Sequence, residues 1–156
     1  MAPKTILLKG DPLLKQAKAT AVAITPGYLL QIDSVAGQVE AHSTSGGNAA
    51  KLFAMENSWV GGEIGTAYAV SAEVMYVSAR PGDEIYAMLA DDENVVRGDY
   101  LESDGDGALR KVVQIDAADS AAILINPASV VGVALEAVDL SATANTTDAR
   151  IKIEIV

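Results

Sequence analysis

The residues that could support acid–base, nucleophilic or metal chemistry are few in this chain. His42 is the only histidine and there is no cysteine, so thiolate metal sites are excluded and a site with several histidine ligands would need a second chain. His42 follows a segment of alternating polar and apolar residues, which predicts that its side chain faces solvent. The acidic run Asp91-Asp92-Glu93 is typical of a solvated loop. These residues predict neither catalysis nor a metal site.

A second acidic run, Asp104-Gly105-Asp106-Gly107, has part of the spacing of a calcium-binding loop. The third acid and the distal glutamate of a full calcium loop are missing, whereas paired glycines are typical of a β-hairpin turn. The close glycines in residues 61–65 lack the strand-to-helix setting of a phosphate-binding loop. We therefore expect a structural or binding protein that is not an enzyme, with no cofactor and no metal.

Composition indicates one domain with an aliphatic core. The chain has 156 residues, of which 50% are hydrophobic and only 4% aromatic. No apolar run reaches the roughly 20 residues that span a bilayer, and the N-terminus lacks a signal-peptide core, so we expect no membrane partner. A net charge of −10, with no basic surface interleaved with aromatic residues, disfavours nucleic acid as a partner. The lack of cysteine fits assembly in a reducing cytoplasm.

Positive charge is concentrated at the N-terminus, in a segment without a sustained helical or strand period. Residues 1–18 contain four lysines and a single acid. We divide the chain into an arm, residues 1–24, and a β-domain, residues 25–156. In one interpretation the arm stays extended until it meets a partner, so a chain without residues 1–20 should still fold. In the other, the arm folds back on its own domain, because Ile6 and the two leucines after it are too apolar to stay unpaired in water.

Short strands between glycine-containing turns dominate the rest of the chain. Alternating side chains and β-branched residues predict at least seven strands, within residues 28–33, 38–42, 73–78, 84–89, 95–102, 109–115, 130–138 and 150–155. Residues 49–56 fit either a strand or one helical turn, and residues 117–122 fit a short helix. The expected fold class is all-β, a single small antiparallel β-barrel or sandwich domain with an extended N-terminal arm.

Six short segments follow one another in a definite order within residues 26–156. They are residues 27–30 (GYLL), 50–54 (AKLFA), 80–84 (RPGDE), 98–103 (GDYLES), 131–137 (VGVALEA) and 149–153 (ARIKI). In this order and spacing, the chain resembles the head decoration, or cement, proteins of tailed bacteriophages. The combination of segments is more specific than any one of them.

This resemblance implies a structural virion protein that is assembled in the host bacterial cytoplasm. It implies a homotrimer at local threefold positions on the outer capsid surface, where it reinforces the shell made by the major capsid protein. The arm would hold neighbouring capsid subunits through Lys4, Thr5, Ile6, Leu7, Leu8, Lys9 and Lys15. Residues 5–8 would pair with a capsid strand edge, and the lysines would complement acidic capsid loops. Trp59 and Tyr68 are the candidates for the interface between subunits.

Two other functions are compatible with the sequence. Trp59, together with the polar loop at residues 43–48, could form a carbohydrate- or receptor-binding module displayed on the virion. A trimeric β-fold hydrolase would instead require carboxylates such as Asp91, Asp92, Asp104 and Asp106 to converge at an interface. The first of these is the stronger alternative to a decoration protein.

Overall fold

The protein is built almost entirely from short β-strands. The computed structural model describes residues 1–20, 22–113, 126–142 and 147–156, and this part of the chain contains no α-helix. None of its elements is a helix that could cross a membrane. The all-β prediction is confirmed. In chain order the elements are β1 (Leu7–Lys9), β2 (Leu13–Ala19), β3 (Leu29–Ile32), β4 (Gln38–Ala41), β5 (Leu52–Ala54), the 3-10 helix η1 (Ser58–Val60), β6 (Glu73–Ser78), β7 (Glu84–Leu89), β8 (Asn94–Val95), β9 (Tyr100–Ser103), β10 (Leu109–Lys111), β11 (Gly132–Ala134), β12 (Val138–Asp139) and β13 (Ala149–Ile155).

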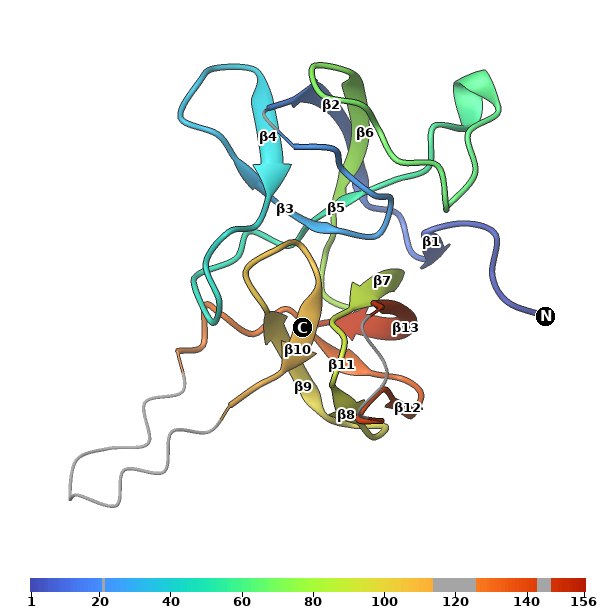
Figure 1. Ribbon diagram of the computed structural model, residues 1–156, viewed down its shortest axis with the longest axis vertical. Helices are drawn as coiled ribbons and strands as arrows, with labels where there is room; N and C mark the ends of the chain where they lie inside the picture. The colour runs from blue at the N-terminus through green and yellow to red at the C-terminus, as the bar shows by residue number, and fades with distance from the viewer. Residues whose placement is uncertain (21, 114–125, 143–146) are drawn as a thin grey trace.

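Five strands form a closed barrel in the order β2-β4-β3-β5-β6, in the upper half of the view in Figure 1. β2 pairs antiparallel with β6 along most of its length and parallel with β4 only at its end. β3 and β4 form the hairpin that the alternating side chains predicted. A buried cluster joins the five strands and contains Ala17, Ala19, Ile24, Leu30, Val39, Leu52, Ala54, Tyr68, Val74 and Tyr76.

The remaining strands form a second sheet in the order β1-β7-β10-β9-β11-β13, below the barrel in Figure 1. β13 also pairs with β7, so five of these strands close into a ring. The predicted alternation at the C-terminus is confirmed, because Ile151, Ile153 and Ile155 are at most 1% exposed. β8 and β12 form a separate two-stranded ladder. The long strands expected over residues 95–102 and 130–138 are therefore each interrupted, and their halves join different ladders.

The barrel and the second sheet share one hydrophobic cluster. Leu29, Phe53 and Val77 pair across β3, β5 and β6, and their side chains join the cluster of the second sheet rather than the barrel interior. The predicted turn after β9 strengthens this contact, since Leu29 N–H donates to Gly107 O at 2.8 Å. Gly107 has a φ of +96°, and a Cβ there would lie 2.9 Å from Cγ of Tyr28. Glycine is therefore required where this hairpin meets the barrel.

The N-terminal segment is part of the folded body. The prediction that residues 1–24 form an arm free of the domain is therefore wrong for residues 6–19. β1 pairs with β7, and β2 is one of the five barrel strands. Ile6 is fully buried in the shared cluster. The alternative in which the arm folds back on its own domain describes these residues, because their apolar side chains and backbone groups find partners in the same chain.

Two further predictions concern local segments. Residues 52–54 form a strand, which decides between the strand and helical-turn interpretations of residues 49–56. The turn at Pro81-Gly82 is confirmed, but it carries the chain from β6 in the barrel to β7 in the second sheet and does not close a hairpin. The predicted helix at residues 117–122 lies outside the described residues.

Candidate functional site

The residues predicted to form a capsid-holding arm are divided between two parts of the fold. Ile6 N–H donates to Glu56 Oε2 at 3.0 Å, and Ile6 O accepts from Tyr86 N–H at 2.7 Å. Leu7 and Leu8 are partly buried on β1, and Lys9 Nζ lies 2.8 Å from Glu84 Oε1. The apolar residues expected to pair with a capsid strand therefore already make contacts within their own chain.

Lys4, Thr5 and Lys15 keep more freedom to contact a partner. Lys4 and Thr5 are exposed ahead of β1. Lys15 lies in the barrel, on β2, where it is directly opposite Tyr76 and partly buried. The predicted arm residues thus belong to two different parts of the fold. Residues 6–9 pack against the second sheet, whereas Lys15 lies on β2 in the barrel.

Trp59 and Tyr68, the two candidates for a subunit interface, differ sharply in exposure. Trp59 and Val60 lie on η1 and are 77% and 79% exposed, so they form an apolar protrusion. Tyr68 is only 6% exposed, and its hydroxyl donates to Met55 O at 2.8 Å. Burial raises the pKa of the Tyr68 hydroxyl, which fits a side chain used inside the barrel. Of the two, only Trp59 has a side chain that another chain could reach.

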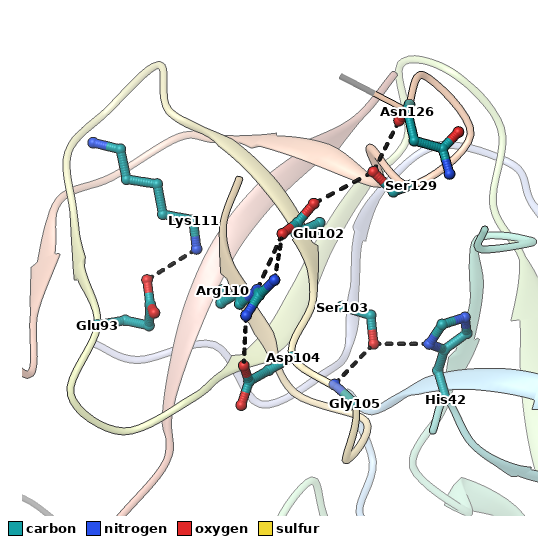
Figure 2. Close-up of polar contacts among 10 residues, drawn as sticks. All are labelled: His42, Glu93, Glu102, Ser103, Asp104, Gly105, Arg110, Lys111, Asn126 and Ser129. Carbon is teal, nitrogen blue, oxygen red and sulfur yellow. Dashed lines mark hydrogen bonds and ion pairs between the residues drawn. The ribbon is translucent and has the colours of Figure 1, made fainter. Parts of the chain in front are cut away.

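His42 is buried, so the prediction that it faces solvent is wrong. It is 2% exposed, and its Nε2 lies 2.9 Å from the carbonyl oxygen of Asn48. A carbonyl only accepts hydrogen bonds, so Nε2 carries the proton and Nδ1 accepts from the Ser103 hydroxyl at 2.8 Å. Ser103 Oγ in turn accepts from Gly105 N–H at 3.2 Å, as Figure 2 shows. His42 N–H still donates to Leu29 O at 2.9 Å, so the residue continues the β3–β4 ladder. Its side chain is buried because β9 of the second sheet covers this outer face of the barrel.

A partly buried ion pair lies near this histidine, on β9 and β10. Glu102 is 5% exposed, and its Oε1 accepts from Arg110 Nε at 3.0 Å and from Arg110 Nη2 at 2.9 Å (Figure 2). Its Oε2 lies 3.3 Å from Ser129 Oγ. β9 and β10 place Glu102 directly opposite Arg110. The pair therefore holds the β9–β10 hairpin together, and burial leaves the carboxylate almost closed to a substrate.

The Ser103–His42 pair has the elements of a nucleophile and a base, but its placement does not suit catalysis. Ser103 is 0% exposed, so its hydroxyl has no access to a substrate. The second imidazole nitrogen faces a backbone carbonyl and not a carboxylate that could stabilise a protonated ring. Within the described ranges, no group of three or more His, Cys, Asp or Glu residues could hold a metal ion. The polar network is best explained as a structural connection between the two sheets.

Three of the four carboxylates considered for a hydrolase lie near enough within one chain for their charges to interact, and a fourth that the sequence did not indicate lies with them. Burial raises the pKa of Asp104, and the negative charges of Asp106 and Asp91 raise it further. Burial and the charges of Asp106, Asp91 and Asp104 likewise raise the pKa of Asp148. Asp92 is exposed and takes no part in these interactions. Asp148 comes from the start of the last strand, far along the sequence, so only the fold brings it here.

The acidic cluster predicts a pH dependence of stability. The pKa of Asp148 is higher in the folded chain than its ordinary value of 3.8, so the folded state binds more protons at mildly acidic pH. Stability from this group is therefore present at low pH and lost as pH rises through the folded pKa. Asp148→Asn removes the charge and keeps an acceptor for Asp91 N–H. We expect its Tm to exceed that of the parent by about 1–3 °C at neutral pH, because solvent screening keeps the effect below about 1 kcal/mol.

A carboxylate with the opposite pKa shift provides the control. Hydrogen bonds from the Ser141 hydroxyl and backbone lower the pKa of Asp139. Asp139→Asn should therefore lower the Tm at neutral pH or leave it unchanged. Thermal melts of both variants and the parent across the acidic range test the sign. An Asp148→Asn variant whose Tm gain grows as pH falls would contradict the argument.

The chain matches no protein-family model and no curated protein. Among solved structures, it is similar to the N base of the head fiber gp8.5 in bacteriophage phi29, with a TM-score of 0.55 and 12% sequence identity. The similarity covers 92% of this chain and 93% of that chain. The two proteins therefore share a fold across the barrel and the second sheet together.

Proposed function

We propose that this chain is a structural protein of a tailed-phage head that binds the outer surface of the capsid and reinforces it. The observation that carries the proposal is the shared fold with a head fiber base over 92% of the chain. The order of short segments that resembles decoration proteins supports the same assignment independently. The inaccessible Ser103–His42 pair is also what a protein without a reaction to catalyse would tolerate.

In this proposal the protein acts as a homotrimer at local threefold positions, with the major capsid protein as its partner. A trimer carries three copies of each weak contact, so linked binding gives high occupancy without any tight single contact. The exposed Trp59–Val60 protrusion is suited to contacts between subunits, because exposed aromatic side chains often dominate binding energy at interfaces. The net charge of −10 keeps unbound protein soluble in the host cytoplasm before shells are ready.

Binding to expanded, undecorated phage heads tests the proposal. We expect cryo-electron microscopy of heads mixed with the full-length protein to show added density at local threefold positions. Heads incubated with the protein should also resist heat or chelator treatment better than bare heads. Repeated incubations that leave the shells bare would refute a decoration role.

Two exposed aromatic residues allow a matched test of the trimer contact. Trp59 lies on η1 and is 77% exposed, whereas Tyr100 lies on β9 and is 57% exposed. If Trp59 forms the subunit contact, Trp59→Ala should shift the native mass from trimer to monomer, and Tyr100→Ala should leave a trimer. The reverse result would move the interface to the outer face of the second sheet.

A carbohydrate- or receptor-binding module displayed on the virion is the second candidate. The high exposure of Trp59 favours it, because a sugar ring can stack on an accessible indole. The loop at residues 43–48 weighs against it, since Gly46 N–H and the Asn48 carbonyl are bonded within the chain. A glycan-array screen without any hit that depends on Trp59 would remove this candidate.

A further inference from the structure

One side of β2 offers an open place for another strand. β6 pairs with β2 from Leu13 to Lys18. On the opposite side, β4 begins at Gln38, directly across from Lys18, and pairs only with the last two residues of β2. Across the described residues no strand pairs with this side of residues 13–17. β2 thus has no strand partner on this side until its last two residues, which lie at the top of the barrel in Figure 1.

The hydrogen bonds at the end of β2 show which backbone groups face the open side. Lys18 N–H donates to Gly37 O at 3.0 Å on the β4 side, and Ala19 N–H donates to Ala72 O at 2.9 Å on the β6 side. Along a strand, the backbone N–H and C=O groups of successive residues point alternately to one side and the other. Leu14 and Gln16 therefore present their N–H and C=O groups to the same side as Lys18, which is the open side. Both residues are exposed, Leu14 by 50%. The edge can therefore accept an incoming strand without rearrangement of β2.

The charge along this edge determines which segment fits it. Lys15 and Lys18 lie on β2, and neither forms an ion pair with another described residue. A second copy of β2 would place lysines against lysines, and like charges on paired strands destabilise the pairing. Edge lysines are a common means of preventing association between identical chains. A segment with acidic side chains would replace this repulsion with opposite-charge pairs.

The acidic character of the whole chain does not prevent such binding. The net charge is −10, but charges further away than about 8 Å are screened at physiological salt. Glu73 is the acid directly across from Lys18 on the β6 side, and it offsets part of the Lys18 charge. Lys15 is opposite Tyr76, which carries no charge at neutral pH, so Lys15 contributes most of the positive potential felt by a strand that pairs directly with this edge.

We propose that the open edge of β2 binds an extended acidic segment of a partner chain, which adds to the barrel as a strand beside Leu14 and Gln16. The backbone groups of these residues supply hydrogen bonds, and Lys15 and Lys18 select acidic side chains. This inference rests on the proposed attachment to a shell, for which it names the contact chemistry. The capsid segment would then be the incoming strand, and this chain would supply the receiving edge.

A short capped peptide that alternates glutamate and valine is the direct probe. We expect it to shift the amide signals of Leu14 and Gln16 most strongly when added to the full-length, isotope-labelled protein at low salt. High salt should weaken binding, and a matched peptide that alternates lysine and valine should bind at least about tenfold more weakly. Binding elsewhere on the protein, or equal binding of both peptides, would overturn the proposal.

Two substitutions at one position separate backbone pairing from side-chain contact. Gln16→Pro removes the N–H that faces the open side but keeps the bonds to β6, whereas Gln16→Ala keeps the N–H. We expect the alanine variant to bind the acidic peptide as the parent does and the proline variant to lose binding. If the proline variant does not fold, the parent with a peptide N-methylated at alternate residues gives the same comparison. Undiminished binding in whichever comparison applies contradicts strand addition.

Two outcomes distinguish this inference from other occupants and from the proposed function. A dimer in sedimentation experiments that Gln16→Ala retains and Gln16→Pro loses would show that a second copy occupies the edge, which overturns the inference. The peptide experiment contains no shell, so its failure leaves the head-binding proposal standing. Heads that stay bare while the acidic peptide binds at Leu14 and Gln16 would remove the capsid as the partner and keep the edge as a binding site.

Discussion

Deleting residues 1–20 is expected to unfold this protein and not merely to release it from a partner. The deletion removes β2, and with it the pairing with β6 and the buried side chains of Ala17 and Ala19. It also removes Ile6, which is fully buried, and loss of one such side chain alone costs about 2–5 kcal/mol. A domain of this size is stable by only about 5–15 kcal/mol. Circular dichroism and amide spectra of the truncated chain should show a loss of cooperative structure.

A shorter deletion is the matched control. Residues 1–4 lie ahead of the buried Ile6, and Met1, Ala2 and Lys4 are exposed. A chain without these four residues should melt cooperatively within a few degrees of the parent, because surface groups of this kind contribute little to stability. A chain that lacks residues 1–20 and melts like the parent would show that β2 is dispensable. The extended-arm interpretation would then stand again.

The sequence alone did not predict β2 as a barrel strand because the buried face of β2 consists of small residues. Ala17 and Ala19 face the barrel interior, while Leu13 and Leu14 are about half exposed near its start. A hydrophobic period built on alanines is weak, and the two leucines break it. The N-terminal strand therefore read as an unstructured basic arm. Only the pairing with β6, far along the chain, makes it a barrel strand.

Local pattern was sufficient where a strand has one clearly buried face or a short hairpin. The isoleucines of β13 and the β3–β4 hairpin are the clearest examples. The hairpin register after β9 was also within reach, because a turn centred near Asp106 places Glu102 opposite Arg110. That pairing is the signal that could have identified the Glu102–Arg110 ion pair before the structure was known.

Contacts between the two sheets could not be predicted from the local sequence pattern. The strict alternation that ends at His42 places its side chain on the outer face of the barrel and so predicts exposure, but the second sheet covers that face and buries the ring. In the same way, Asp148 joins Asp104 and Asp106 only because β13 pairs with β7. The sequence indicates those strands that have one clearly buried face, whereas the choice between one barrel and two connected sheets depends on long-range pairing.

Phe53, the single phenylalanine of the chain, is the largest fully buried side chain in the cluster that joins the two sheets. Its side chain is 0% exposed, and it lies between Leu29 and Val77 in the row that faces the second sheet. Phe53→Ala would leave a cavity between two sheets that each have their own hydrogen bonds and cannot easily move together. We expect the free energy of unfolding to fall by about 3–5 kcal/mol, measured by urea denaturation.

Trp59→Ala provides the control for side-chain size, because it removes a larger aromatic group from a site that is 77% exposed. When it is measured as a monomer, this variant should have a free energy of unfolding within about 0.5 kcal/mol of that of the parent. Hydrogen exchange then tests the placement of Phe53 between the sheets. Since it belongs to the shared cluster, Phe53→Ala should speed exchange in both β6 and β13. Faster exchange in β6 alone would mean that Phe53 stabilises only the barrel, and that the two sheets are joined chiefly by the polar network around His42 and Ser103.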